Sequence, residues 1–441
     1  MAQEIIVYLD DYKYSGDGNY DTMYLDFRTK TDFAAYVREL GIKEPTRGSY
    51  LQIEGYRSPK RLMRGAYYAL NIDMLKQLKP EPIPESLIFA HSYSFNNYAG
   101  KNDETYHLLQ AHELLNPADL ATPHHNRIEK LEEVAGREYL KFRVNDVSQA
   151  NWNEVLDDKV VLYVFDIGAP IHSKAPEVQS YIDSYARSYT NDKPVLILSH
   201  WDIDHYHCLL QMSEADVKAN FSKFICPDKI KNNMAQQVFD KMEKGLGPAN
   251  VHSVLLYGRT AETAYPLMHQ EYSNHGFRLY SGERSRNVNY SGLVIYIEGT
   301  KGNVLLTGDC LPVQASDVLA DCTANLNYEK EHYLVVPHHG GDFKTKKVYK
   351  TYNIPMMQKP KEAIISVDVG NNTYGHPTKE MINFLKSVAN WNITRTDKGN
   401  LSNPYSLSYD LLENMMKEHE RELTDKFIES IDLDQKISKE E

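Results

Sequence analysis

The feature that most constrains the fold is a series of apolar, strand-like runs, most of which end in a histidine or an aspartate. They include VVLYVFDIG from residue 160, KPVLILSH from 193, NVLLTGD from 303 and HYLVVPHHGG from 332. Helical patterns such as APEVQSYIDSYARSY lie between some of these runs. Apolar strands separated by helices are typical of layered α/β folds with buried sheets. The chain is therefore predicted to be α/β.

The length of 441 residues favours more than one structural unit. Residues 1–137 mix strand-like runs such as EIIVYLD and TMYLDF with helical ones such as DFAAYVREL. We expect them to form an N-terminal α+β domain of unknown role. The α/β pattern then occupies 138–405, and we expect this part to fold when the preceding residues are removed.

The last 32 residues, from Asp410 to Glu441, carry eleven acids and five bases. Apolar residues recur there at steps of three and four, which indicates one face of a helix. We predict an acidic amphipathic C-terminal helix and tail over 406–441. A solvated helix that packs on the body explains this pattern, and so does a helix that binds a partner or a second copy.

Composition excludes several classes of protein. A net charge of −12 argues against a broad basic surface for nucleic acid, although it does not exclude a local basic groove. No apolar run approaches the roughly 18 residues of a membrane span, and the first residues lack the basic and apolar pattern of a signal peptide. Four cysteines without a CxxC pair do not make a disulfide scaffold. We expect a cytoplasmic protein that makes no contact with a membrane.

The sharpest chemical feature is the sequence HWDIDH directly after VLILS. It contains His200, Asp202, Asp204 and His205. Aspartate is a good helix N-cap, so one of these acids needs no metal. Two imidazoles and two carboxylates within six residues nevertheless form a mixed N/O donor set that suits zinc or manganese. The cluster therefore predicts a metal site.

Three further clusters follow later strands. Asp309 ends NVLLTGD, His338 and His339 lie in PHHGG, and His376 lies in NNTYGHP. Two adjacent histidines in an extended chain point in different directions. We therefore expect one of His338 and His339 to bind the metal and the other to donate a proton or to orient a ligand.

The order HxDxDH, TGD, PHHG and NxYGHP resembles the metallo-β-lactamase superfamily. It is most similar to the metallo-β-lactamase domain of ComEC-type DNA-internalisation competence proteins. The resemblance covers about residues 139–405, and it implies an αββα sandwich around one or two metal ions. It implies that His200 and Asp202 bind the first ion, that Asp204, His205 and His376 bind the second, and that Asp309 bridges both. Many relatives have a further histidine ligand between positions 205 and 309, and here His338 or His339 would complete the first site instead.

The same resemblance implies a hydrolase with two divalent ions, Zn²⁺ or Mn²⁺. Phosphodiesterase or nuclease chemistry through a metal-bridging hydroxide is favoured, with Asp204 orienting the nucleophile and His338 or His339 donating a proton. A nucleotide or a single-stranded nucleic acid is the expected substrate, and the basic run at 344–347 would suit a phosphate. Two alternatives stay open: hydrolysis of a peptide, ester or lactam bond, and a non-catalytic metal-containing module that binds a partner protein or a second copy through the N-terminal domain or C-terminal helix.

Overall fold

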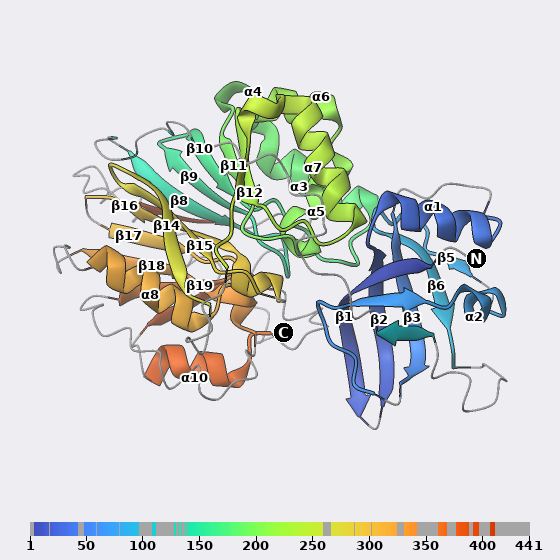
Figure 1. Ribbon diagram of the computed structural model, residues 1–441. Helices are drawn as coiled ribbons and strands as arrows, with labels where there is room; N and C mark the ends of the chain where they lie inside the picture. Colours follow the sequence, from blue (N-terminus) through green and yellow to red (C-terminus); the bar gives the residue numbers. More distant parts are fainter. Residues whose placement is uncertain are drawn as a thin grey trace, which may run out of the picture.

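The computed structural model describes most of the chain up to residue 396 and one later strand (Figure 1). The described residues are 4–16, 18–42, 48–58, 60–78, 80–96, 108–111, 139–258, 266–285, 287–300, 302–323, 330–341, 360–367, 376–387, 391–396 and 406–410, with residues 128, 131, 134 and 137. In this part of the chain, no helix has the length and apolar character needed to cross a membrane. The cytoplasmic location stays a prediction.

Two mixed sheets of seven strands each form the centre of the α/β part. The first of them has the order β13-β12-β11-β10-β9-β8-β21, and the second has the order β14-β15-β16-β17-β18-β19-β20. The strands of the first are β8 (Leu140–Asn145), β9 (Asn153–Asp157), β10 (Val160–Phe165), β11 (Val195–Ile197), β12 (Lys223–Pro227), β13 (Val251–Val254) and β21 (Ser406–Asp410). Those of the second are β14 (Met268–Asn274), β15 (Phe277–Gly282), β16 (Leu293–Glu298), β17 (Gly302–Leu306), β18 (Glu331–Val335), β19 (Pro360–Ile365) and β20 (Asn392–Arg395).

The two sheets pack face to face, and helices cover their outer faces. The side-chain period of two explains this layering. In β11, Val195 and Ile197 belong to the core between the sheets, whereas Leu196 packs in the outer, helix-covered core. In β16, Ile295 lies between the sheets and Tyr296 lies on the other side.

The helices form the two outer layers. Those outside the first sheet are α3 (Ala175–Tyr185), α4 (Tyr189–Asp192), α5 (Ile203–Gln211), α6 (Glu214–Asn220) and α7 (Asn233–Leu246). Those outside the second are α8 (Pro312–Thr323) and α10 (Lys379–Ser387). The predicted α/β class and αββα layering are confirmed. Strands β16 and β17 pair antiparallel as a hairpin.

One predicted element is different. The segment 406–410, assigned to the C-terminal helix, forms strand β21 and pairs antiparallel with β8. The alternating sequence SLSYD has the period of a strand, and the exposed edge of β8 offers it backbone hydrogen bonds. The boundary at 405 is therefore wrong for these five residues. The rest of the predicted helix lies outside the described residues, and so does the basic run at 344–347.

The N-terminal part contains a third sheet of seven strands, in the order β5-β6-β3-β2-β1-β4-β7. Its strands are β1 (Ile5–Gly16), β2 (Asn19–Phe27), β3 (Tyr50–Arg57), β4 (Tyr67–Leu70), β5 (Glu81–Pro82), β6 (Phe89–Ser94) and β7 (Leu109–Ala111), and its helices are α1 (Lys30–Glu39) and α2 (Ile72–Lys76). Residue 137 as the end of this unit stays a prediction.

The N-terminal sheet packs against the helical side of the first α/β sheet (Figure 1). Tyr24, Tyr50 and Phe89 belong to the same continuous core as Trp201 and Tyr206, although they come from separate regions of the sequence. Removal of the N-terminal sheet would expose that core to water. The two parts therefore share a hydrophobic core.

A buried lysine links the two parts electrostatically. The ammonium of Lys231 lies 2.5 Å from Asp10 Oδ1, on β1, and it also donates to Asp202 Oδ1. The ring of Tyr8 lies 5.1 Å from the same nitrogen. Burial lowers the pKa of Lys231, but the two carboxylates outweigh burial and raise this pKa well above its usual value. Lys231 therefore stays charged in the folded protein.

We predict that Lys231→Met destabilises the metal-free protein by about 3–5 kcal/mol, because the substitution leaves two buried carboxylates without their cation. Urea unfolding in the presence of a chelator measures this free energy. The matched control is Lys244→Met, which removes an exposed lysine 3.5 Å from Glu214 and should change stability by less than about 1 kcal/mol. Equal effects of the two substitutions would contradict the prediction.

The shared core also changes the expectation for the fragment that begins at residue 138. We predict that it is insoluble, or that it unfolds at a lower temperature than the full chain, because it lacks Asp10 and exposes the core around Tyr206. Expression of both forms and thermal unfolding followed by circular dichroism test this. A soluble fragment as stable as the whole protein would show that the two parts fold independently.

Candidate metal centre

The polar clusters predicted from the sequence meet at the carboxyl ends of parallel strands. Asp166 follows β10 and His200 follows β11, and these two strands pair in parallel. Across the sandwich, Asp309 follows β17 and His338 follows β18, which form another parallel pair. Ligand sites of open α/β sheets lie at this edge, because loops from several strands converge there. The topology thus places residues from distant parts of the chain together.

Helix α5 begins inside the HWDIDH motif, with Asp202 as its N-cap residue. Asp204 and His205 lie in its first turn. The helix approaches the loop after β10 closely: Ile167 N donates to His205 O at 2.9 Å, and a Cβ on Gly168 would come within 1.7 Å of Asp204 O. Only a glycine at 168 allows this approach.

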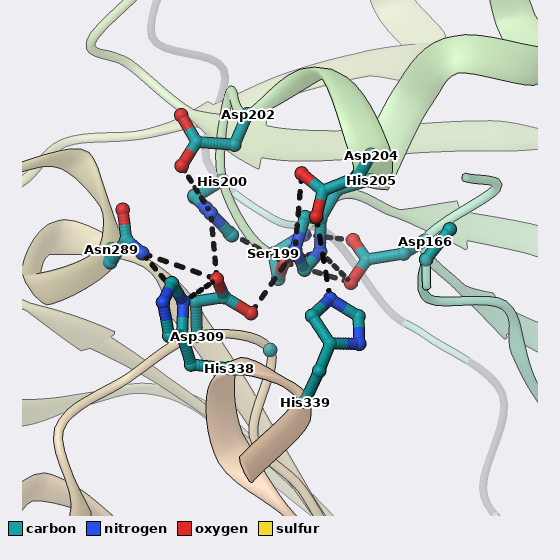
Figure 2. Close-up of polar contacts among 12 residues, drawn as sticks. Asp166, Ser199, His200, Asp202, Asp204, His205, Asn289, Asp309, His338 and His339 are labelled. Atoms are coloured by element: carbon teal, nitrogen blue, oxygen red, sulfur yellow. Dashed lines mark hydrogen bonds and ion pairs between the residues drawn. The ribbon is translucent and has the colours of Figure 1, made fainter. Parts of the chain in front are cut away.

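His205 is held from both sides of its ring. Its Nδ1 lies 2.8 Å from Asp166 Oδ2, and its Nε2 lies 3.1 Å from Asp309 Oδ1 (Figure 2). Ser199 strengthens the first contact, because its backbone N–H and its hydroxyl donate to Asp166 at 2.7 and 2.8 Å. A carboxylate on Nδ1 fixes the tautomer that leaves the Nε2 lone pair available to a metal.

Asp309 lies at the centre of the cluster (Figure 2). One oxygen, Oδ2, accepts a hydrogen bond from the side-chain amide of Asn289 at 3.1 Å and contacts His338 Nδ1. The same oxygen is 4.0 Å from His200 Nε2. Its other oxygen faces His205. Asp309 therefore contacts both halves of the sandwich, as a bridging ligand must.

His338 and His339 both point into the cluster, contrary to the expectation from an extended chain. They lie in a 3₁₀ turn, Pro337–Gly340, and both have left-handed backbone conformations with φ of 53° and 51°. The turn directs His338 to Asp309 and places His339 Nε2 at 3.4 Å from Asp204 Oδ2. The premise of an extended segment was wrong, and the division of roles between the two histidines stays a prediction. Left-handed residues other than glycine are concentrated at functional sites.

The pKa values reflect the mutual contacts of these groups. Burial raises the pKa of Asp309, but His338 and His205 hold it well below its usual value. Burial lowers the pKa of His205, yet the carboxylates of Asp166 and Asp309 raise it well above the usual range. Burial, His338 and His339 lower the pKa of His376 to about 3. A bound cation would replace protons on the coordinating imidazoles, since a histidine ligand must be neutral.

The buried polar atoms of the cluster fit a metal ion. Among the described residues, His200 Nε2, His205 Nε2, His339 Nε2 and Asp309 Oδ1 are buried and make no hydrogen bond. Their nearest charged neighbours are other site residues: His205 and Asp309 face each other at 3.1 Å, His200 faces Asp202 at 3.3 Å, and His339 faces Asp204 at 3.4 Å. Buried polar atoms are rarely left in this state. Two groups bring such atoms within 4.8 Å of one another: His200, His205 and Asp309, and then Asp204, His205 and His339. Nitrogen and carboxylate donors at this separation suit a divalent transition metal.

Three of the seven predicted ligands lie outside these two groups: His338, which contacts Asp309 through its Nδ1, and the more peripheral Asp202 and His376. Asp202 Oδ2 is 3.3 Å from His200 Nε2, while its other oxygen accepts from Lys231. The ring of His376 lies 5.1 Å from that of His338. Both residues border the cluster, and their role as ligands stays a prediction. His339 takes the position beside Asp204 and His205 that the resemblance assigned to His376.

Four residues with no role assigned from the motifs contribute to the cluster: Asp166, Ser199, Asn289 and Lys231. Asp166 and Ser199 lie at strand ends, so the pattern of apolar runs carries a signal for them. Asn289 occupies the region where a further histidine was sought, and His269 instead lies 3.4 Å from Glu283. Lys231 has no signal in the sequence, because its partners lie 29 and 221 residues away.

No family model and no curated protein sequence matches this chain. Among solved structures, Tm1679, a metal-dependent hydrolase of the β-lactamase superfamily, has 14% identity and a TM-score of 0.34 over 62% of this chain and 99% of its own. YhfI of Bacillus subtilis, a metallo-β-lactamase fold protein, has 10% identity and a TM-score of 0.33 over 62% of this chain and 100% of its own. The human tRNase Z short form has 13% identity and a TM-score of 0.30 over 49% of this chain and 88% of its own. These similarities are low, and the function proposed below rests on the geometry of the cluster.

We predict that Asp166→Asn weakens metal binding by about 10- to 100-fold, because the amide cannot accept from Ser199 and His205 as the carboxylate does. Asparagine tolerates the left-handed backbone of this residue, with φ of 64°. Asp158→Asn is a matched control, since Asp158 is an exposed residue with φ of 53°. Competition with a chromophoric chelator measures the affinity. Equal affinities in both variants would show that Asp166 does not support a metal ligand.

Proposed function

We propose that the protein is a metal-dependent hydrolase of the metallo-β-lactamase superfamily and that it cleaves a phosphodiester. One observation carries the proposal: buried side-chain atoms of His200, His205, His339 and Asp309, which make no hydrogen bond, converge at the strand ends of an αββα sandwich. Buried polar atoms that make no hydrogen bond cost free energy, and here their charges are balanced only by one another. A divalent cation would satisfy all of them.

We assign two divalent ions, Zn²⁺ or Mn²⁺, to the centre. His200 and Asp202 would hold the first, and Asp204, His205 and His339 would hold the second, with Asp309 shared. His376 lies beside His338, at the border of the cluster. Cations bound there would lower the pKa of a bound water from 15.7 to about 7 and would polarise the oxygen of a phosphoryl group.

The residues of the chain supply orientation and proton transfer. Asp204 is the most exposed carboxylate of the cluster, with 28% of its side chain accessible, and it faces both His205 and His339. It can orient an attacking water and accept its proton. His338 is also partly exposed, at 18%, and its contact with Asp309 raises its pKa against the effect of burial. It can donate a proton to a leaving oxygen, while His339 is fixed by the 2.9 Å contact of its Nδ1 with Ser366 O.

A nucleotide or a single-stranded nucleic acid is the substrate class that the ComEC-type motif set favours. The acidic net charge supports a small or single-stranded substrate over a long duplex, since each phosphate contact needs a cation. A partner protein or a second copy, bound through the N-terminal part or the C-terminal helix, is compatible with this activity and stays a prediction, as does a cytoplasmic location.

We predict that the Mn²⁺- or Zn²⁺-loaded protein cleaves bis(p-nitrophenyl) phosphate and a short single-stranded oligonucleotide, and that Asp309→Asn lowers turnover by more than about 100-fold, because the shared ligand is lost. Asp183→Asn, on the exposed side of α3, is the matched control and should keep full activity.

Three results would contradict this function. Cleavage of p-nitrophenyl acetate or of a chromogenic lactam, without cleavage of either phosphodiester, would assign a different bond. Absence of turnover on every substrate in protein that holds its metal would indicate a non-catalytic module. Unchanged turnover in Asp309→Asn would remove the cluster from the reaction.

A further inference from the structure

We propose that Arg64, which belongs to the N-terminal part, is an anion-binding residue of the metal centre and contacts the phosphate group of the substrate. The inference rests on the proposed function, and it assigns to the N-terminal sheet a direct part in substrate recognition. It depends on the position of one guanidinium group and on the way the surrounding chain fixes it.

The backbone around Arg64 is firmly anchored. Arg64 lies in the segment between β3 and β4, which runs beside β1. Gly65 N donates to Leu9 O at 2.8 Å, and Leu9 N donates to Ala66 O at 3.0 Å. On the other side, Leu62 N donates to the hydroxyl of the buried Tyr20 at 2.6 Å. These contacts fix the origin of the Arg64 side chain on a rigid sheet, which is where a recognition residue is positioned most accurately.

The guanidinium is held at one end and faces the metal centre with the other. Its Nε donates to Asp10 O at 2.8 Å. Its two terminal nitrogens lie 3.5 Å from Asp11 Oδ1 and 3.9 Å from Asp202 Oδ2. The contact with Asp202 is longer than a hydrogen bond, and 42% of the side chain is exposed. The side chain is thus exposed enough to meet an anion that approaches the cluster from solvent.

The positive charge of Arg64 also acts on residues of the second α/β sheet's half of the sandwich. It is close enough to act electrostatically on His338 and His376, which follow strands of the second α/β sheet, and on Tyr290 in the loop before β16. Asp202 follows strand β11 of the first α/β sheet, as the N-cap residue of α5. Arg64 therefore lies near the candidate ligands of both halves, where a substrate must bind in order to react.

The ion pair of Arg64 with Asp202 is not needed to neutralise this aspartate. Lys231 already neutralises Asp202 from the buried side. An additional ion pair at 3.9 Å with a partly exposed arginine contributes little to stability. In contrast, an anionic substrate needs a cation beside the carboxylates Asp202, Asp204 and Asp309. Arginine suits this role because its planar fork binds phosphate with two parallel hydrogen bonds.

The test compares Arg64→Met with Arg61→Met in Mn²⁺-loaded full-length protein. Arg61 lies in the same segment but is exposed, with its guanidinium 5.9 Å from the ring of Tyr14. Isothermal titration with inorganic phosphate measures anion binding without turnover, and metal analysis shows the occupancy of each variant. We expect phosphate affinity to fall about 10- to 100-fold in Arg64→Met and to stay unchanged in Arg61→Met. Arg64→Lys, which keeps the positive charge but lacks the planar guanidinium, should give an intermediate affinity for phosphate.

Equal phosphate affinities in Arg64→Met and Arg61→Met would overturn the inference, as would a loss explained entirely by lower metal occupancy. This measurement separates the inference from the proposed function. Phosphate binding that depends on Arg64, in protein that cleaves neither phosphodiester, would support the anion site and refute the activity. Phosphodiester cleavage with an unchanged KM in Arg64→Met would support the activity and refute the role of Arg64.

Discussion

The constraint on which the site depends is the burial of carboxylates. Asp166, Asp202 and Asp309 are each less than a tenth exposed, and an ionised carboxylate away from water is costly unless it is paired. Each has a different partner. Asp166 accepts from Ser199 and contacts His205, Asp202 accepts from Lys231, and Asp309 contacts imidazoles on both sides. Buried atoms of His200, His205, His339 and Asp309 itself make no hydrogen bond, and a cation beside Asp309 would complete the charge balance there.

The N-terminal sheet contributes to the charge balance of the site. Asp10 shares Lys231 with Asp202, so a residue of β1 controls the charge beside a candidate ligand. Arg64 approaches the same aspartate from the solvent side. The hydrophobic contact between the two parts makes this arrangement rigid. The α/β sandwich supplies the ligands, and the N-terminal sheet supplies two cationic contacts: it positions Lys231 and contributes Arg64.

Much of the architecture was predictable, because the strands of a buried sheet are apolar along their whole length and the site residues follow them directly. Asp309 and the HWDIDH cluster were identified in this way. The geometry of PHHGG was not, because consecutive left-handed residues leave no mark in the apolar pattern. Strand β21 was missed because a five-residue strand is short and lies far in sequence from its partner β8. Lys231 and Arg64 were out of reach for a related reason: their importance comes from contacts between segments that only the tertiary fold brings together.

The central claim is that a metal ion occupies the cluster around Asp309. Anomalous diffraction from crystals of the Mn²⁺- or Zn²⁺-loaded protein, recorded at the absorption edge of the metal, tests it most directly. The account predicts at least one anomalous peak about 2.0–2.2 Å from an imidazole nitrogen of His205 or His200 and from an oxygen of Asp309. A loaded crystal with an intact cluster and no anomalous peak there, or with its metal bound elsewhere, would contradict the account.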